Sequence, residues 1–202
     1  MSATDHKATL HRYLRIAREA LLWKLDGLSE YDMRRPMTPT GTNLLGLVKH
    51  VASVTDGYLG DVMGRPSGID LPWFPADPAD EVPNADLWVP ADQATADIID
   101  LHHRVAAHSD ATIEALDLDA VGNVPWWGDQ GEITLHQALV HVTTETNRHA
   151  GHADIIRELI DGAVGHRQDV DNMWAGEGED YWPSLRRQIE DAASQAQAAS
   201  EV

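Results

Sequence analysis

The sequence predicts an all-α protein, a four-helix bundle with long loops and a short C-terminal helix. In four long segments, apolar residues recur at steps of three and four, which is the spacing of one helix face. Glycines or proline-rich stretches separate these segments. A chain of 202 residues fills one core but not two. We therefore expect a single domain over 1–202, with the bundle at about 3–162 and a loop and helix in 163–202.

The first two helices are predicted at about 3–26 and 42–63. Residues 29–41 contain two prolines and are interpreted as a connecting loop. Each helix has a regular apolar face. That of the first contains Leu10, Tyr13, Leu14, Ala17, Leu21 and Leu25, and that of the second contains Leu44, Leu47, Val51, Val54, Tyr58 and Val62.

His50 lies at the border of the second apolar face, and Gly46 and Gly57 lie on its side of the helix. A glycine inside a helix costs roughly 1 kcal/mol relative to alanine, which indicates that something approaches the helix closely there. A metal or a substrate beside His50 is one explanation. Tight helix packing around a hydrogen-bonded histidine is the other, and periodicity leaves both open.

Two connections carry embedded aromatic residues. The segment 65–90 has six prolines together with Trp73, Phe74 and Trp88, and it is either a lid over a site or a packed surface wrap. The connection 117–133 contains Trp126 and Trp127, which either wall a pocket or cap the bundle.

The third helix is predicted at about 91–116, with Ile98, Leu101, Val105, Ile113 and Leu116 on its inner side. His102, His103 and His108 in this helix are interpreted as surface residues or as hydrogen-bonded core residues. His6 and His11 of the first helix are expected to be solvated.

The fourth helix, Thr134 to Gly162, is the element around which the site is organised. Thr134 with a glutamine three residues later forms a capping box, and Gly162 ends the helix. At about 100° per residue, Glu145, His149 and His152 fall within roughly 60° of one another. They lie in line with the apolar residues of the same face, which are Ala138, Val142, Ile156, Leu159 and Ile160. A last helix is expected at about 183–193, with Leu185 and Ile189 as packing residues.

A carboxylate and imidazoles in a buried stripe must be compensated for their loss of water, and a shared cation does this well. Glu145 and His149 are one turn apart, so both can reach one ion. His50 is the best candidate for a third ligand from another helix. Three protein ligands leave a coordination position open, as in catalytic sites. A buried hydrogen-bonded polar network without metal is the alternative.

Nitrogen and oxygen donors suit Zn, Ni, Fe or Mn. His152 and His141 lie at nearby angles on the fourth helix. Either one could replace a ligand, or hold a ligand or a bound water by a hydrogen bond.

Composition narrows the function classes. A net charge of -18 and a pI near 4.7 argue against nucleic acid or an anionic membrane as partner. The chain has no cysteine, so any thiol in its chemistry comes from a substrate or cosubstrate. Without a signal peptide or an apolar spanning segment, we expect a cytoplasmic protein.

Three stretches carry a family resemblance: LLGLVKH (Leu44 to His50), VPWWG before the fourth helix, and HVTTETNRHAGHADIIRELIDG (His141 to Gly162). The chain resembles the DinB-like (DinB/YfiT) superfamily of metal-dependent four-helix-bundle proteins, in particular its actinobacterial branch of unknown function. The resemblance assigns the three metal ligands of that superfamily to His50, Glu145 and His149. Many members have histidine in place of Glu145. The carboxylate variant is similar to the mycothiol-dependent maleylpyruvate isomerases.

The resemblance implies a metal-dependent S-transferase that joins a low-molecular-weight thiol, such as mycothiol, to a small electrophile, with zinc as the expected metal. A hydrolase or isomerase that uses metal-bound water is one alternative. A non-catalytic metal-binding or stress-response module, closed by a fourth ligand such as His152, is another. For the protein as a whole, we expect a small-molecule substrate as the binding partner. We also expect it to form a homodimer through its helix faces.

Overall fold

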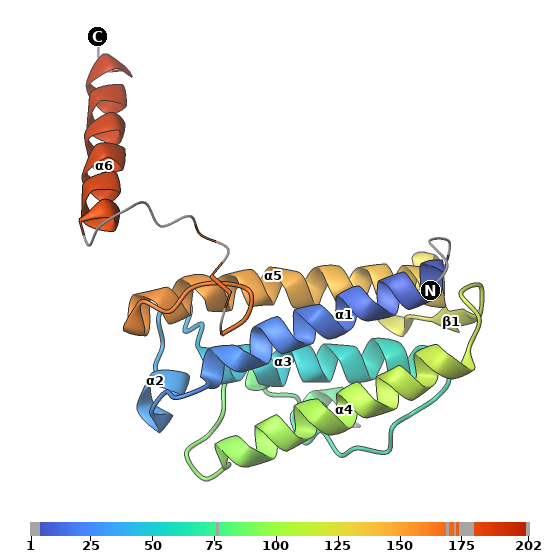
Figure 1. The fold of residues 1–202 in the computed structure, drawn as a ribbon. Coiled ribbons are helices and arrows are strands. Elements are labelled where there is room, and N and C mark those ends of the chain that lie inside the picture. The colour runs from blue at the N-terminus through green and yellow to red at the C-terminus, as the bar shows by residue number, and fades with distance from the viewer. Residues whose placement is uncertain (1–4, 76, 169, 172, 174–179, 201–202) are drawn as a thin grey trace.

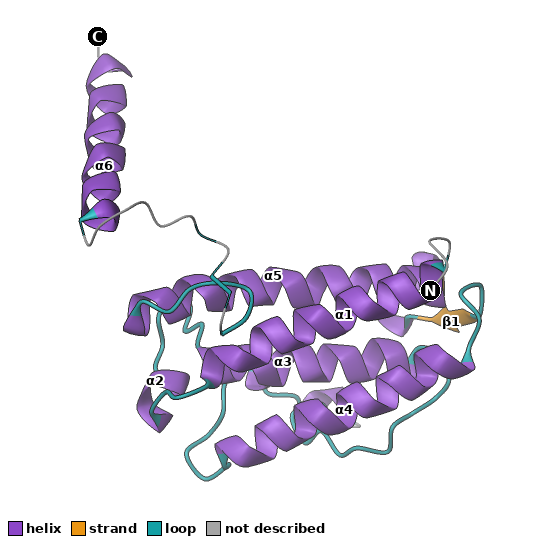
Figure 2. Ribbon diagram, in the orientation of Figure 1, coloured by secondary structure: helices purple, strands orange, loops and turns teal. Residues whose placement is uncertain are grey.

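Four long helices pack side by side as a bundle (Figure 1). The computed structural model describes residues 5–75, 77–168, 170–171, 173 and 180–200. Helix α1 (His6–Leu22) packs against α5 (Leu135–Asp161), and α3 (Leu44–Asp56) packs against both α5 and α4 (Thr95–Ala115). Figure 2 shows that helices dominate the fold. The predicted all-α bundle is confirmed, and no described helix is apolar and long enough to cross a membrane.

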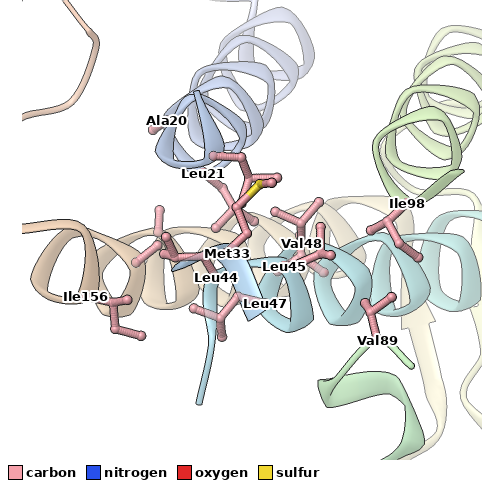
Figure 3. Packing of buried hydrophobic residues seen from close by; sticks show 14 residues of the cluster. Ala20, Leu21, Met33, Leu44, Leu45, Leu47, Val48, Val89, Ile98 and Ile156 are labelled. Carbon is pink, nitrogen blue, oxygen red and sulfur yellow. The ribbon is translucent and has the colours of Figure 1, made fainter. Parts of the chain in front are cut away.

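Helix α3 is the central element of the core. Leu44, Leu45, Leu47 and Val48 are each at most 3% exposed. Figure 3 shows side chains of α1, α4 and α5 around this stretch, including Leu21, Ile98 and Ile156. Burial on nearly all sides explains why the apolar run of α3 is almost continuous instead of confined to one stripe.

Helix α5 begins and ends as predicted. The Thr134 hydroxyl accepts a hydrogen bond from the Gln137 amide at 3.2 Å, and Gly162 ends the helix with a φ of 79°. Val142 and Ile156 of the predicted apolar face are buried. The prediction was wrong for Leu159, which is 66% exposed. Because it precedes Ile160 by one residue, or about 100°, it lies at the edge of the buried face.

The connection 29–41 contains a short helix that was not predicted, α2 (Glu30–Arg34). The Ser29 hydroxyl caps it by accepting from the Asp32 amide at 3.1 Å. The second predicted helix is shorter than expected, because α3 ends at Asp56 and a π-helical turn, Gly57–Asp61, follows it. A 3₁₀ turn, Trp23–Leu25, likewise completes α1.

A two-stranded antiparallel hairpin precedes α5. Strands β1 (Val121–Asn123) and β2 (Glu132–Thr134) pair with Gly122 opposite Ile133, and a 3₁₀ segment, Pro125–Gln130, joins them. The sequence did not predict these strands because three residues are too few to display an alternating pattern.

The C-terminal helix α6 (Tyr181–Ser200) is longer than the predicted 183–193. Alanine, glutamine and glutamate favour helix, and neither glycine nor proline follows Pro183. The predicted packing of Ile189 was wrong, because its side chain is 61% exposed and α6 lies apart from the bundle in Figure 1. Parts of the predicted loop 163–180 lie outside the described residues.

Segment 65–90 packs against the bundle through Trp73 and the turn Ala85–Leu87, while Phe74 and Trp88 are 46 and 51% exposed. The Trp73 ring is 8% exposed, and its Nε1 donates to the Ser53 hydroxyl of α3 at 2.9 Å. Two 3₁₀ turns follow, Pro78–Asp80 and Ala85–Leu87, and the second lies against α3. Of the two interpretations, a packed wrap describes the segment better.

Candidate metal centre

Three side chains from two helices converge beside the core. His50 of α3 meets Glu145 and His149 of α5, and one ligand atom of each lies within 4.8 Å of the others. Glu145 Oε1 lies 2.8 Å from His149 Nε2 and 3.5 Å from His50 Nε2. The two imidazole planes are inclined at 77°. The structure thus brings together the three residues that the sequence singled out as metal ligands.

The donor set fits a divalent metal. Tetrahedral zinc with bonds of about 2.0–2.2 Å places its nitrogen and oxygen ligands roughly 3.4 Å apart, and the two Glu145 distances lie on either side of that value. The side chains of His50, Glu145 and His149 are 19, 28 and 12% exposed. All three side chains therefore keep part of their surface in contact with solvent.

Asp86, from the turn Ala85–Leu87, completes the arrangement, and sequence analysis did not single it out. Its Oδ2 lies 2.6 Å from His50 Nδ1. In the tautomer with its proton on Nδ1, His50 donates to this carboxylate, and the lone pair of Nε2 is then directed toward Glu145. A carboxylate behind a histidine in this way fixes the ring and raises its basicity as a metal ligand.

The backbone of that turn is fastened to α3. A Cβ added at Gly46 would lie 1.9 Å from the carbonyl oxygen of Leu87. Lys49 Nζ donates to the carbonyl oxygens of Ala85 at 2.7 Å and Trp88 at 2.9 Å. The close approach predicted at Gly46 is therefore made by loop backbone. At Gly57 the prediction was wrong, because an added Cβ meets nothing within 4 Å.

The two remaining candidate histidines lie near the cluster without facing its centre. His152 is exposed, and its Nδ1 lies 3.3 Å from His149 Nδ1, the ring nitrogen opposite the one that faces Glu145. The His141 ring packs against Tyr58, with centroids 4.5 Å apart, and against Trp127 at 5.3 Å.

The charges within the cluster are tightly coupled. Burial lowers the pKa of His50, but the hydrogen bond and charge of Asp86, together with Glu145, outweigh it and raise the pKa above its ordinary value. Burial raises the pKa of Glu145, but its contacts with His149 and His50 leave it lowered. Burial lowers the pKa of His149 and outweighs the hydrogen bond to Glu145. The protein therefore holds a negative carboxylate between a basic imidazole and a neutral one, which is suited to a cation.

The other histidines lie outside this group. His11, expected to be solvated, is 14% exposed and its Nε2 lies 2.9 Å from an Asp110 oxygen. His102 is buried, and burial lowers its pKa to about 4. His6 and His103 are exposed, and the His108 ring bonds to the carbonyl oxygen of Arg65.

Comparison with known families adds one match. The family model described as mycothiol-S-transferase matches residues 9–162, from α1 through the end of α5. The matched range contains His50, Asp86, Glu145 and His149, and it leaves out α6. No curated protein matches the chain.

Proposed function

Because the chain belongs to the mycothiol-S-transferase family, we propose that it is a metal-dependent enzyme that joins a low-molecular-weight thiol such as mycothiol to a small electrophile. The proposed metal ligands are His50, Glu145 and His149. The observation that carries the proposal is the convergence of their ligand atoms within 4.8 Å on a partly exposed surface. Zinc is the expected metal, and the donors also suit Ni, Fe and Mn.

Each side chain has a distinct part in this chemistry. A bound divalent cation lowers the pKa of a coordinated thiol and thereby supplies a thiolate at neutral pH. Asp86 holds the proton on His50 Nδ1, so that Nε2 stays free to bind. Glu145 contributes negative charge between the two imidazoles. Since the chain has no cysteine, the nucleophilic sulfur belongs to the cosubstrate.

Two observations favour an open, catalytic site over a closed metal-binding module. His50, Glu145 and His149 all keep part of their surface exposed. His152, the proposed fourth ligand of a closed site, lies against Nδ1 of His149 and not against its Nε2. We place the reaction in the cytoplasm, where small thiols are kept reduced. The homodimer stays a prediction.

Metal analysis and a thiol-dependent assay test the proposal together. Protein purified without an affinity tag should contain about one divalent metal per chain by elemental analysis. It should accelerate the reaction of mycothiol with N-phenyl bromoacetamide, followed as thioether formation. His149→Ala should lose both the metal and the activity, whereas His103→Ala, which alters an exposed histidine of α4, should lose neither.

The opposite outcomes are informative. Retention of stoichiometric metal by His149→Ala rejects the ligand assignment. Turnover that proceeds equally well without mycothiol rejects the transferase and favours the alternative in which metal-bound water attacks the substrate.

A further inference from the structure

The proposed metal ligands form one end of a longer row of side chains in which α3 and the turn after it face α5. His50 contacts His149, and Tyr58, eight residues later, contacts His141, eight residues earlier on α5. The two segments therefore run antiparallel here, and the row extends about 12 Å along the helix axes. Val54 lies between its ends and is only partly buried. A molecule lying along this row touches both ends.

The far end of the row is aromatic. We define the aromatic cluster as Tyr58, Trp126, Trp127 and His141. Tyr58 packs edge to face against Trp126 with centroids 5.5 Å apart and lies 5.9 Å from Trp127, which in turn lies 5.3 Å from His141. Because His141 precedes Glu145 by one helical turn, their backbone positions lie about 6 Å apart along the axis of α5.

Two backbone features hold the aromatic cluster in position: the π-helical turn Gly57–Asp61 and the hairpin of β1 and β2. Tyr58 belongs to the π-helical turn Gly57–Asp61, a rare conformation that is frequent at functional sites. The hairpin that carries the tryptophans docks directly on the same end of the bundle, since the Asn123 amide donates to the Val62 carbonyl oxygen at 3.1 Å. A Cβ added at Gly122 would lie 2.3 Å from that oxygen.

The rings of the aromatic cluster range from buried to exposed, as expected for a site that binds a ligand at the surface. Tyr58 is 7% exposed and forms the base, Trp127 is partly buried, and Trp126 is 62% exposed. Tryptophans that only capped the bundle would gain most by burying their rings. Here the indole of Trp126 stays in solvent while its edge contact with Tyr58 holds it in place.

We propose that the aromatic cluster binds an aromatic or flat apolar group of the electrophile, whose reacting atom then extends along the row to His50, Glu145 and His149. The cluster offers ring faces and edges, which recognise such groups by stacking and by burial of apolar surface. The identification of the bound group as part of the electrophile rests on the proposed transferase function. Binding of an aromatic group by the cluster does not depend on it.

Fluorine NMR of protein labelled with fluorotryptophan tests the binding without any reaction. Acetanilide should shift the Trp126 resonance saturably, whereas N-methylacetamide, which lacks the ring, should leave it in place. Trp126→Leu should weaken acetanilide binding roughly 3- to 10-fold, the size of one aromatic pair contact. Because this variant lacks the Trp126 resonance, its binding is followed at Trp127, which contacts Tyr58 and His141 in the same cluster. Trp182→Leu, which removes a tryptophan of α6 that is 41% exposed, serves as control and should bind as the unaltered protein does.

Three results would overturn the inference: no saturable shift at Trp126, equal weakening in both variants, or a shift caused by mycothiol but not by acetanilide. A kinetic comparison adds the link to catalysis. The metal-loaded protein should prefer N-phenyl over N-methyl bromoacetamide, although the carbon that reacts is the same in both compounds. Trp126→Leu should reduce that preference by a similar 3- to 10-fold. If neither compound reacts, the transferase proposal fails, and the NMR measurement still decides whether the cluster binds aromatic groups.

Discussion

The Asp86 carboxylate lies 2.6 Å from Nδ1 of His50, across 36 residues of sequence. This hydrogen bond joins the proline-rich segment 65–90 to the helix that supplies the first proposed metal ligand. The same turn is held to α3 by Lys49 and by the close approach at Gly46. The loop is therefore part of the candidate site, and substitutions in it should change the affinity of that site for a metal.

Removal of Asp86 should weaken metal binding while leaving the fold intact. Asp86→Ala should lower zinc affinity about 10- to 100-fold, because His50 loses the partner that orients it and raises its basicity. Asp86→Asn should lose less, since its amide oxygen still accepts the Nδ1 proton. Competition with a chromophoric chelator measures both, and Asp92→Asn, an exposed aspartate of the same region, is the control. Unchanged affinity in Asp86→Ala would show that the hydrogen bond has no part in metal binding.

A methyl group at Gly46 should weaken metal binding by displacing the turn that carries Asp86. In Gly46→Ala the new Cβ would overlap the Leu87 carbonyl oxygen, so the turn that carries Asp86 must move. We expect a loss of about 1–3 kcal/mol in the free energy of unfolding, together with weaker zinc binding. Gly57→Ala is the matched control: with open space and a φ of −58°, it should be neutral or stabilising by up to about 1 kcal/mol. Urea denaturation compares the two, and equal effects would contradict the close-approach argument.

His152 separates an open site from a closed one. Because its Nδ1 lies against Nδ1 of His149, we expect His152→Ala to keep one metal per chain and to lose less than about 100-fold in affinity, as for loss of a supporting hydrogen bond. If His152 were a fourth ligand, its loss would resemble that of His149→Ala. Titration of both variants with zinc distinguishes the cases.

The local parts of the site could be predicted from the sequence. Glu145 and His149 lie one turn apart on a helix whose cap at Thr134 and end at Gly162 follow from neighbouring residues alone. His50 comes from a second helix, and the family resemblance indicated its role, whereas of the two glycines on its side only Gly46 marks a close approach, which is made by loop backbone. The match to the mycothiol-S-transferase family confirms the DinB-like resemblance, while the actinobacterial branch stays a prediction.

Asp86 could not be found in the same way. It is one of several aspartates in a segment without periodicity, and its partner is a loop-to-helix contact that no local rule encodes. Apolar spacing also does not say how far a buried face extends, which is why Leu159 and Ile189 were misplaced. The strands of the hairpin were too short to show a pattern.

His102 should make the protein sensitive to acid. It is 5% exposed, and its Nδ1 has no hydrogen-bond partner among the described residues. Burial, followed by the positive charge of Arg18 and then by His103, lowers its pKa from 6.5 to about 4. The unfolded chain takes up a proton at this histidine below about pH 6.5, whereas the folded protein resists it until about pH 4. Since the unfolded state then binds more protons, stability falls as the pH drops through this window.

A substitution that cannot be protonated isolates this effect. Between pH 7 and pH 5, His102 should account for about 2 kcal/mol of the loss in unfolding free energy, given about 1.4 kcal/mol per pKa unit. In His102→Gln the loss over the same interval should be smaller by that amount, whatever the variant's stability at pH 7. His6→Gln, at an exposed position of α1, should keep the full dependence, because His6 is not among the groups that lower the His102 pKa. Urea denaturation at both pH values provides the four free energies for each comparison. If the unfolding free energies of His102→Gln and of the unaltered protein fell equally with pH, His102 would not be a neutral buried imidazole.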